Sequence, residues 1–572
     1  MVFNFIQSFM SGTSPEILIL TEIGVMIIVA TIFAFFVKMT RQPLIPAYIL
    51  TGILIGPLFL GLIKEPELIK SLSEIGVAFL IFTAGLEIKF KKLKEVGRVA
   101  FVGGVLQIAI LFFLAFLVST FLGFSGQAPI YIGLVVAFSS TMIVVTLLSE
   151  RRELNSLHGR IIIGMLLVQD IAAIVALIVL GSDFSMNSVL IVLGKAVIFA
   201  VIAIILSKAV NPILSKAADN HELLLLVSIS FLFMFVIGAF FAELSLIIGA
   251  FFAGVALANS NYKTEIQGKV SSLREFFAVI FFVTLGMQLQ MFSQNYVLLF
   301  FALLFLVIII KPIVIMFLVR IFGYKKRTAF FTGNALAQTS EFSLIIVTLG
   351  LGLGQINEGL FSVLVLLTIL TMSMTTYFIT YEKNFVNWFG FPLNFLEGIK
   401  SRKEELEYHR NDGKKIVIFG CHRMGSLILK EFEKKKGDLF VVDYNPEIIR
   451  SLINKKIPCI YGDFMNDEVF DRAHVNDAEI VISTIPDFED NFLLINKIRK
   501  KNNKALIIVA ASRISEALEM YKIGADYVVL PKIMGGEKSA SLIKKMKRGD
   551  IGLKEIKQGH IKYLQGIHHL LY

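Results

Sequence analysis

Gln169 and Asp170 interrupt an otherwise apolar run between residues 161 and 180. The run is long enough to cross a bilayer, where a carboxylate near the middle costs at least about 2.5–3.5 kcal/mol. An acid in that position usually faces a cavity and carries function, the alternative being a buried carboxyl satisfied by neighbouring hydroxyls. Proton and metal cation compete for such a carboxylate, because either one neutralises it. One acid implies one charge in each direction, so the pattern predicts electroneutral one-for-one exchange.

Two other apolar segments carry polar residues near their middle, namely Ser139, Ser140 and Thr141 in the first, and Gln338 and Glu341 in the second. Transporters place small polar residues where a membrane helix is interrupted, and inverted repeats bring two such interruptions to one ion site. Back-bonding to the helix and small-residue packing are the structural alternatives for the hydroxyls. Beside an intramembrane acid, both interpretations stay open.

Charged and amide side chains near these segments are expected to support the site. Lys311 lies inside an apolar segment just before Pro312. It could snorkel to the interface, neutralise Asp170 or Glu341, or tether an interrupted helix, and we favour the tether. Gln338 and Glu341 are counted with it as supporting polar groups. Glu87 ends an apolar segment, where we expect an interfacial role rather than ion binding.

The composition indicates a membrane domain followed by a soluble one. Of the 572 residues, 56% are hydrophobic and 17% are charged, against about 25% charged in soluble domains. Thirteen candidate spans lie near 16–37, 43–62, 70–88, 97–122, 128–149, 160–181, 187–207, 221–242, 244–260, 272–290, 296–320, 328–352 and 358–380. The pair 221–242 and 244–260 could instead form a single span.

Basic residues predict the orientation, because cytoplasmic loops are enriched in Lys and Arg. With the N-terminus outside, nineteen Lys and Arg residues fall in loops on the cytoplasmic side, and only Lys64 and Lys70 fall outside. The net charge of +11 is therefore mainly a topology signal rather than a nucleic-acid footprint. We expect a multi-pass protein of the cell inner (plasma) membrane with a cytoplasmic C-terminal domain. Cys421 and Cys459 both fall in that domain, so no structural disulfide is expected.

A nucleotide-binding pattern begins at residue 414. The β-rich run 415–419 leads into a glycine-containing turn and a helical segment, with the candidate ligand residues Gly420, His422, Arg423, Met424 and Gly425. A second strand, 439–442, ends in Asp443. A strand, a glycine turn, a helix N-terminus for phosphate and an acid for the ribose form a Rossmann fingerprint. Further strands near 457–460, 479–483, 505–510 and 526–529 predict a parallel sheet.

The fingerprint is incomplete at one position. His422 replaces the middle glycine, which normally lets the backbone approach a pyrophosphate. An adenine mononucleotide is therefore favoured over tightly bound NAD(H), and His422 or Arg423 could contact a phosphate directly. A Rossmann fold without a ligand is the structural alternative. Cys421 could respond to oxidation, although a small core cysteine is the simpler interpretation.

Six motifs follow one another along the membrane segments: Gly85-Leu86-Glu87, Ser139-Ser140-Thr141, Val168-Gln169-Asp170-Ile171-Ala172-Ala173, Ile248-Gly249-Ala250-Phe251-Phe252-Ala253-Gly254, Phe281-Phe282-Val283-Thr284-Leu285-Gly286-Met287 and Glu341-Phe342. Together they resemble the monovalent cation:proton antiporters, most closely the Kef-type potassium/proton branch with its Gln-Asp pair. The resemblance implies a 13-helix inverted-repeat fold with crossed broken helices, and a homodimer. It also implies that Asp170 is shared by cation and proton, with Gln169 and the hydroxyls of 139–141 around the ion.

The soluble part offers matching positions at Gly420, Gly425 and Asp443, at Gly462-Asp463 after the third strand, and at Ser483-Thr484 after the fourth. These resemble the nucleotide-binding regulatory domain (RCK or TrkA-N) of potassium channels and transporters. The resemblance implies AMP, ATP or NAD(H) as a regulatory ligand, held in part by Asp463 and Thr484, and pairing of such domains across a dimer. The Kef branch is often gated by glutathione and its conjugates. No motif indicates that here, so a glutathione-type effector or an ancillary subunit stays open.

We therefore predict a transmembrane antiporter domain over 1–382, a charged linker over 383–413 that is partly helical near 400–410, a nucleotide-binding domain over 414–532 and a short tail over 533–572. The predicted function is nucleotide-regulated K⁺/H⁺ antiport by a secondary transporter rather than an enzyme, with membrane lipid but no nucleic acid as a partner. Na⁺/H⁺ antiport is the nearest alternative. A nucleotide-gated channel would need a Thr-Val-Gly-Tyr-Gly-type filter, which the sequence lacks. A membrane-anchored oxidoreductase would need a substrate site near the glycine turn.

Overall fold

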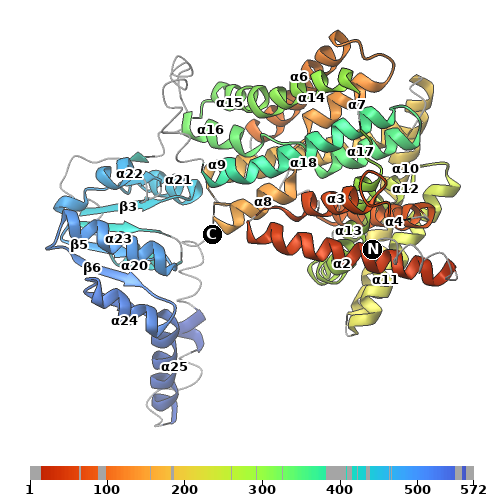
Figure 1. Cartoon of the computed structure of the whole chain (residues 1–572). Coiled ribbons are helices and arrows are strands. Elements are labelled where there is room, and N and C mark those ends of the chain that lie inside the picture. The colour runs from red at the N-terminus through yellow and green to blue at the C-terminus, as the bar shows by residue number, and fades with distance from the viewer. Residues whose placement is uncertain are drawn as a thin grey trace, which may run out of the picture. The chain divides into compact units, whose positions relative to one another are not determined.

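The computed structural model (Figure 1) describes residues 15–547 and 557–561 except for 41, 64–65, 88–97, 152, 155, 182–185, 219, 259, 292, 325, 382–406, 409–414, 422, 433–437, 463 and 465–466. The chain divides into two compact units. The first comprises Met1–Leu154 and His158–Lys400, and the second comprises Asn155–Leu157 and Ser401–Tyr572.

The first unit is helical (Figure 1). Its elements are α2 (Pro15–Met39), α3 (Leu44–Ile55), α4 (Pro66–Glu87), α6 (Arg98–Phe121), α7 (Ala128–Ala137), α8 (Thr141–Glu150), α9 (Leu157–Leu180), α10 (Met186–Ala217), α11 (His221–Phe241), α12 (Leu246–Ala258), α13 (Lys263–Met287), α14 (Gln294–Phe305), the π-helix η1 (Leu306–Ile310), α15 (Lys311–Ile321), α16 (Lys326–Ala335), α17 (Glu341–Gly352) and α18 (Glu358–Thr380).

Each of the thirteen predicted spans coincides with a helix or with consecutive helices of this unit. Among the described residues, nine helical segments are long and apolar enough to cross a membrane, and α3, α12 and α17 are shorter apolar helices. The number of crossings therefore stays a prediction. The possible fusion of 221–242 with 244–260 does not occur, because α11 ends at Phe241 and a turn with Glu243 at φ 55° precedes α12.

Small residues let four of these helices pack at close range. A Cβ on Gly52 of α3 would lie 1.9 Å from the Val283 carbonyl oxygen of α13, and one on Gly254 of α12 would lie 2.1 Å from the Phe82 carbonyl oxygen of α4. In lipid, helices associate through such backbone contact rather than through a hydrophobic driving force. The glycines at these contacts are thus required by packing.

The second unit is built on a seven-stranded sheet. Its strands are β1 (Glu407–Tyr408), β2 (Ile416–Phe419), β3 (Leu439–Asp443), β4 (Cys459–Tyr461), β5 (Ile480–Ser483), β6 (Leu506–Ala510) and β7 (Tyr527–Val529), in the order β1-β4-β3-β2-β5-β6-β7. All pairs are parallel except β1 with β4. Without β1, this is the Rossmann strand order, with its switch point between β2 and β5. The predicted parallel sheet is confirmed.

Helices cover both faces of the sheet, because alternate strand residues enter two separate cores. The covering helices are α20 (Arg423–Glu431), α21 (Pro446–Asn454), α22 (Asp467–Arg472), α23 (Phe488–Lys501) and α24 (Ile514–Lys522), and the exposed helix α25 (Pro531–Lys547) follows the last strand. Ile418 and Val441 pack with side chains of α20 and α21. Val417 and Phe440 belong to the core that contains residues of α22, α23 and α24.

Two boundary predictions differ from the structure. The linker was expected to be helical near 400–410, but Glu407 and Tyr408 form an edge strand opposite Ile460 and Cys459, while the rest of that stretch lies outside the described residues. Pairing with the exposed edge of β4 satisfies backbone groups that would otherwise stay open. The tail boundary at 532/533 falls inside α25, which continues to Lys547.

Candidate functional site

Two interrupted helices meet in the membrane unit. The first interruption, Phe138–Ser140, separates α7 from α8 and has extended backbone at both ends, with ψ 154° at Phe138 and 121° at Ser140. The second, 336–340, separates α16 from α17. Hydrogen bonds join the two: the Ser139 hydroxyl donates to the Leu336 carbonyl at 3.0 Å, and the Ser343 hydroxyl of α17 donates to the Val135 carbonyl of α7 at 3.0 Å.

Serine side chains restart a helix after each interruption. The Ser140 hydroxyl accepts from the backbone N–H of Ile143, and the Ser340 hydroxyl accepts from that of Phe342. The Ser343 hydroxyl in turn accepts the Ser340 backbone N–H at 3.3 Å, which completes a capping box. One serine of each interruption, Ser140 and Ser340, therefore acts as the N-cap of the helix that follows.

Asp170 and Gln169, both on α9, face the first interruption. Thr141 at the start of α8 donates its hydroxyl to the Asp170 carboxylate, at 2.9 Å from each oxygen. Gln169 is buried and accepts the backbone N–H of Ser139 at 2.7 Å through its side-chain oxygen. The predicted acid and the predicted hydroxyl cluster thus form one site, held by two neighbouring contacts.

Lys311 lies at the crossing of the two interruptions and is fully buried. Its ammonium donates to the carbonyls of Val136 at 2.9 Å, Phe138 at 2.7 Å and Gln338 at 2.6 Å. Helix C-termini carry unpaired carbonyls and partial negative charge, so a cation there stabilises both broken helices. Among the described residues, no carboxylate forms an ion pair with Lys311. This geometry corresponds to the tether expected from the sequence.

The π-helix η1 directly precedes Lys311, and Pro312 follows it. A π-turn inserts an extra residue into the helix and is common at functional sites. A Cβ on Gly333 of α16 would lie 2.6 Å from the Pro312 carbonyl oxygen. α15 and α16 therefore pack backbone to backbone, which brings the lysine within reach of the carbonyl of Gln338.

Three buried polar atoms beside residues 139–142 have no hydrogen-bond partner among the described residues: Gln169 Nε2, Gln338 Oε1 and Glu341 Oε2. Gln338 contacts the site by donating its amide to the Ser140 carbonyl at 3.4 Å. Glu341, the first residue of α17, lies beside the Ser140 side chain and the Met142 backbone. Unpaired buried oxygens next to a carboxylate are the groups that can replace water around a cation.

The sequence predicts an ion ligand in Gln169, and this stays a prediction: its amide oxygen accepts the Ser139 N–H, while the amide oxygens of Gln338 and Gln107 have no hydrogen-bond partner among the described residues. Other residues of the site were missed. Gln107 of α6 donates to the Ala137 carbonyl at 3.3 Å, and Thr371 and Thr375 of α18 contact Thr339 and Ala337. Gln107 is a lone polar residue in an apolar span, and the two threonines share a helix face, which is the signal that could have found them.

Glu87 is the last residue of α4. Gln267 of α13 donates to its carboxylate at 3.2 Å, and Arg274 lies 3.9 Å from it. Both partners lie on α13, beside the close-packed glycine contacts of the bundle. This placement agrees with an interfacial role rather than a cation ligand.

The second unit brings together the predicted nucleotide residues at the ends of β2, β3 and β5. Gly420 has φ +83°, a conformation that side chains rarely adopt, and the Thr484 hydroxyl donates to its carbonyl at 2.9 Å. A Cβ on Gly425 would lie 2.3 Å from the same carbonyl oxygen. Asp443 accepts backbone N–H groups of Cys421 at 2.6 Å and Asn445 at 2.7 Å. The glycine turn is thereby fixed at the topological switch point.

The remaining nucleotide predictions are placed only in part. Met424 lies on the first turn of α20, partly buried, and Arg423 begins that helix. His422 and Asp463 lie outside the described residues. Cys421 is buried with Ile418 and Cys459, and burial, followed by the nearby Asp443 charge, raises the pKa of its thiol to about 12. A thiol that stays protonated is a poor nucleophile, so a core role fits this cysteine.

Known sequences match both units. Residues 25–380 match the transmembrane sodium/hydrogen exchanger family, and residues 416–531 match the TrkA-N domain. The chain belongs to the sodium/hydrogen exchanger family. The resemblance to Kef-type antiporters with a C-terminal regulatory domain is thus confirmed, as is the combination of a helical membrane domain and a Rossmann-like domain. The protein is a multi-pass cation/proton exchanger with a soluble TrkA-N domain.

This exchanger is similar to relatives from bacteria and plants. It is 28% identical over 544 residues to YbaL of Escherichia coli (strain K12), named for cation/proton antiport, covering 90% of this chain and 95% of YbaL. It is 30% identical over 373 residues to K(+) efflux antiporter 4 of Arabidopsis thaliana. That match covers 63% of each, so the chain spans less than two thirds of the plant relative.

Among solved structures, the sodium proton antiporter MjNhaP1 of Methanocaldococcus jannaschii matches with a TM-score of 0.50 at 16% identity. The match covers 66% of this chain and 98% of MjNhaP1. At this level of identity the likeness shows the fold of the membrane domain.

Proposed function

We propose that this exchanger moves K⁺ against H⁺, one for one, with Asp170 holding either ion in turn. The observation that carries the proposal is the position of this carboxylate, which is bound by Thr141 beside the point where two broken helices cross. A carboxylate there has one negative charge to neutralise. If both loaded forms cross the membrane and the empty anion does not, each turnover exchanges equal charge.

In this proposal the residues around Asp170 have different roles. Thr141 and Gln169 fix the acid and the backbone beside it, Ser139 links the two interruptions, and Ser140 starts α8. The open oxygens of Gln338 and Glu341 would complete the coordination of a cation that has lost water. Lys311 holds the helix ends and leaves Asp170 free for its cargo.

The choice of K⁺ rests on relatives rather than on the geometry. K(+) efflux antiporters 4 and 6 of Arabidopsis thaliana match at 30% and 31% identity, whereas the family name and MjNhaP1 refer to sodium. Na⁺/H⁺ exchange by the same site is the second candidate. We further propose a homodimer in the cell inner membrane, with the N-terminus outside and the TrkA-N domain in the cytoplasm.

The TrkA-N domain is proposed to bind an adenine nucleotide, AMP or ATP, or NAD(H), and to regulate exchange. The fixed glycine turn of Gly420, the N-terminus of α20 and the Asp443 carboxylate meet where Rossmann domains hold phosphate and ribose. In the described part of the chain, we find no acid–base pair and substrate cavity near this turn that would support hydride transfer. A sensing role is therefore favoured over catalysis.

Proton flux in proteoliposomes tests the exchange proposal. When K⁺ is added outside, its entry should drive H⁺ out and make the lumen of wild-type proteoliposomes more alkaline. Asp170→Asn should abolish this pH change. Glu74→Gln, an exposed acid on α4, is the matched control and should keep it. Antiport that survives Asp170→Asn, or a membrane current driven by voltage at zero pH gradient, would overturn the proposed mechanism. Parallel assays with Na⁺ and Li⁺ decide the selectivity.

A further inference from the structure

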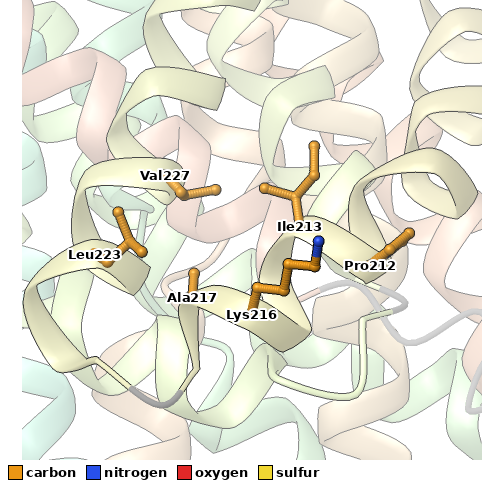
Figure 2. A pocket seen from close by; sticks show the side chains of 6 residues that line it. All are labelled: Pro212, Ile213, Lys216, Ala217, Leu223 and Val227. Atoms are coloured by element: carbon orange, nitrogen blue, oxygen red, sulfur yellow. The ribbon is translucent and has the colours of Figure 1, made fainter.

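A pocket outside the exchange site opens between the end of α10 and the start of α11. Its volume is about 260 Å³, and it is lined by Pro212, Ile213, Lys216, Ala217, Leu223 and Val227. Figure 2 shows the α10 side chains on one side of the hollow and Leu223 and Val227 of α11 on the other. Lys216 is the charged member of an otherwise apolar lining.

The pocket lies next to two candidate membrane spans. The spanning part of α11 begins at Glu222, so Leu223 and Val227 fall within its first two turns. In α10 a candidate span covers Asn187–Ser207, and the same helix continues to Ala217. Lysines that flank a span place their stems along apolar surface and their ammonium groups at headgroup level. A lysine that follows a candidate span in this way can reach lipid phosphates.

Both sides of the pocket carry apolar side chains that are exposed at the surface of the membrane unit. Ile213 is 54% exposed and Leu223 is 45% exposed, in helices whose spanning parts are only 17% and 28% buried within the protein. Apolar side chains at such positions contact acyl chains. The hollow between these side chains is a place where one acyl chain can bind against the protein.

Lys216 is exposed, and among the described residues it has neither a hydrogen bond nor an ion pair. An ammonium group binds phosphate as a point charge, and one lysine near a membrane surface contributes about 1 kcal/mol to the attraction for anionic lipid. We propose that the pocket binds one anionic phospholipid, with its phosphate at Lys216 and an acyl chain against Ile213, Leu223 and Val227.

Native mass spectrometry of the detergent-purified full chain tests the proposal, with phosphatidylglycerol and phosphatidylcholine as probes. Wild type should retain phosphatidylglycerol, and Lys216→Gln should bind it about fivefold more weakly, the equivalent of one lost surface charge. Lys38→Gln, an exposed lysine in the last turn of α2, is the charge-matched control and should bind as wild type does. Lys216→Arg should restore binding.

A second pair of variants tests the apolar half of the site without a change of charge. Ile213→Trp fills the pocket and should release phosphatidylglycerol, whereas Ile198→Trp, at an exposed position of the same helix, should not. Equal binding by Lys216→Gln and Lys38→Gln would overturn the proposal. So would phosphatidylcholine binding as tightly as phosphatidylglycerol, displacement of the lipid by inorganic phosphate at equal concentration, or a polypeptide found in the pocket.

Discussion

The helix crossing of the membrane unit and the glycine turn of the soluble unit both lie at the ends of helices, but the two places differ in how completely their polar atoms are hydrogen-bonded. At the glycine turn, both Asp443 oxygens accept backbone N–H groups and the Thr484 hydroxyl is paired. At the crossing, Gln169, Gln338 and Glu341 each keep a buried atom with no partner in the described structure. A buried polar atom without a partner costs about 1–3 kcal/mol.

The difference indicates what each site is built to do. A turn whose own groups are satisfied is a rigid platform that offers backbone N–H groups to a ligand and holds its shape without one. A crossing with open oxygens retains a cost that a dehydrated cation can remove. In the proposed mechanism this cost is the binding energy that the transported ion gains at the crossing, while Lys311, which could otherwise neutralise Asp170, donates to three carbonyls.

The largest effect is expected from Lys311→Met, which keeps the side-chain length but removes the charge that holds the crossing together. Three buried carbonyls would lose their partner, at a cost of about 1–3 kcal/mol for each carbonyl left unsatisfied. Thermal unfolding of the detergent-purified protein should show a strongly lowered midpoint, with Lys38→Met as the control that stays at the wild-type value. An unchanged midpoint for Lys311→Met would show that Lys311 does not hold the two interrupted helices together.

Replacing Asp443 tests whether ligand binding at the glycine turn depends on this hydrogen-bonded carboxylate. Asp443→Ala leaves the N–H groups of Cys421 and Asn445 without their acceptor and removes the ribose partner. Calorimetry with AMP, ATP, NAD and NADH should show a loss of at least about tenfold, the size of one charged hydrogen bond. Glu447→Ala, on the neighbouring helix α21, is the control. Equal affinity of Asp443→Ala and wild type would exclude Asp443 from the site.

A smaller effect is expected from Thr141→Val, which keeps the shape of the side chain but removes the hydroxyl bound to Asp170. Hydrogen bonds to a charged group are worth about 1.5–3 kcal/mol, so exchange should fall about tenfold or more. Thr141→Ser should recover most of the rate. Thr348→Val removes a hydroxyl that bonds only within its own helix and should leave exchange unchanged. A wild-type rate in Thr141→Val would mean that the hydroxyl does not position the acid.

The smallest effect is expected from thiol chemistry. Because burial raises the pKa of Cys421 to about 12, very little thiolate is present near neutral pH. Labelling with a thiol reagent in the native state should be slow and should rise about tenfold per pH unit, without a plateau below pH 10. Unfolding should expose both cysteines to rapid labelling. A native labelling plateau near pH 8 would show that the thiol is accessible and the core role is wrong.

Much of this arrangement could be predicted, because the signals are local in the sequence. A polar interruption of an apolar run is visible without any structure, so Asp170, the serines of 139–140 and the segment around Gln338 were found. The strand–glycine–helix pattern around Gly420 is equally local. In both cases the apolar pattern of a helix or strand is interrupted, by polar residues in the membrane segments and by glycine at the turn.

The rest depended on contacts that a single sequence does not reveal. Ser343 and Thr375 look like ordinary helix hydroxyls, and Thr375 does bond within its own helix while also contacting the Ala337 carbonyl. The strand at Glu407 forms because β4 has a free edge, although the surrounding charged residues favour a helix. α25 runs through Gly535 and Gly536, which lower helix propensity, so no pattern in the sequence indicates that a helix crosses the predicted boundary between domain and tail.

Proton release on cation binding measures the competition at Asp170 most directly. The purified protein in weakly buffered detergent solution is titrated with KCl while pH is recorded, with choline chloride as the ionic-strength control. The account predicts that wild type releases protons in proportion to the K⁺ bound and that Asp170→Asn releases none. K⁺ binding by wild type without proton release, or equal release from Asp170→Asn, would contradict it.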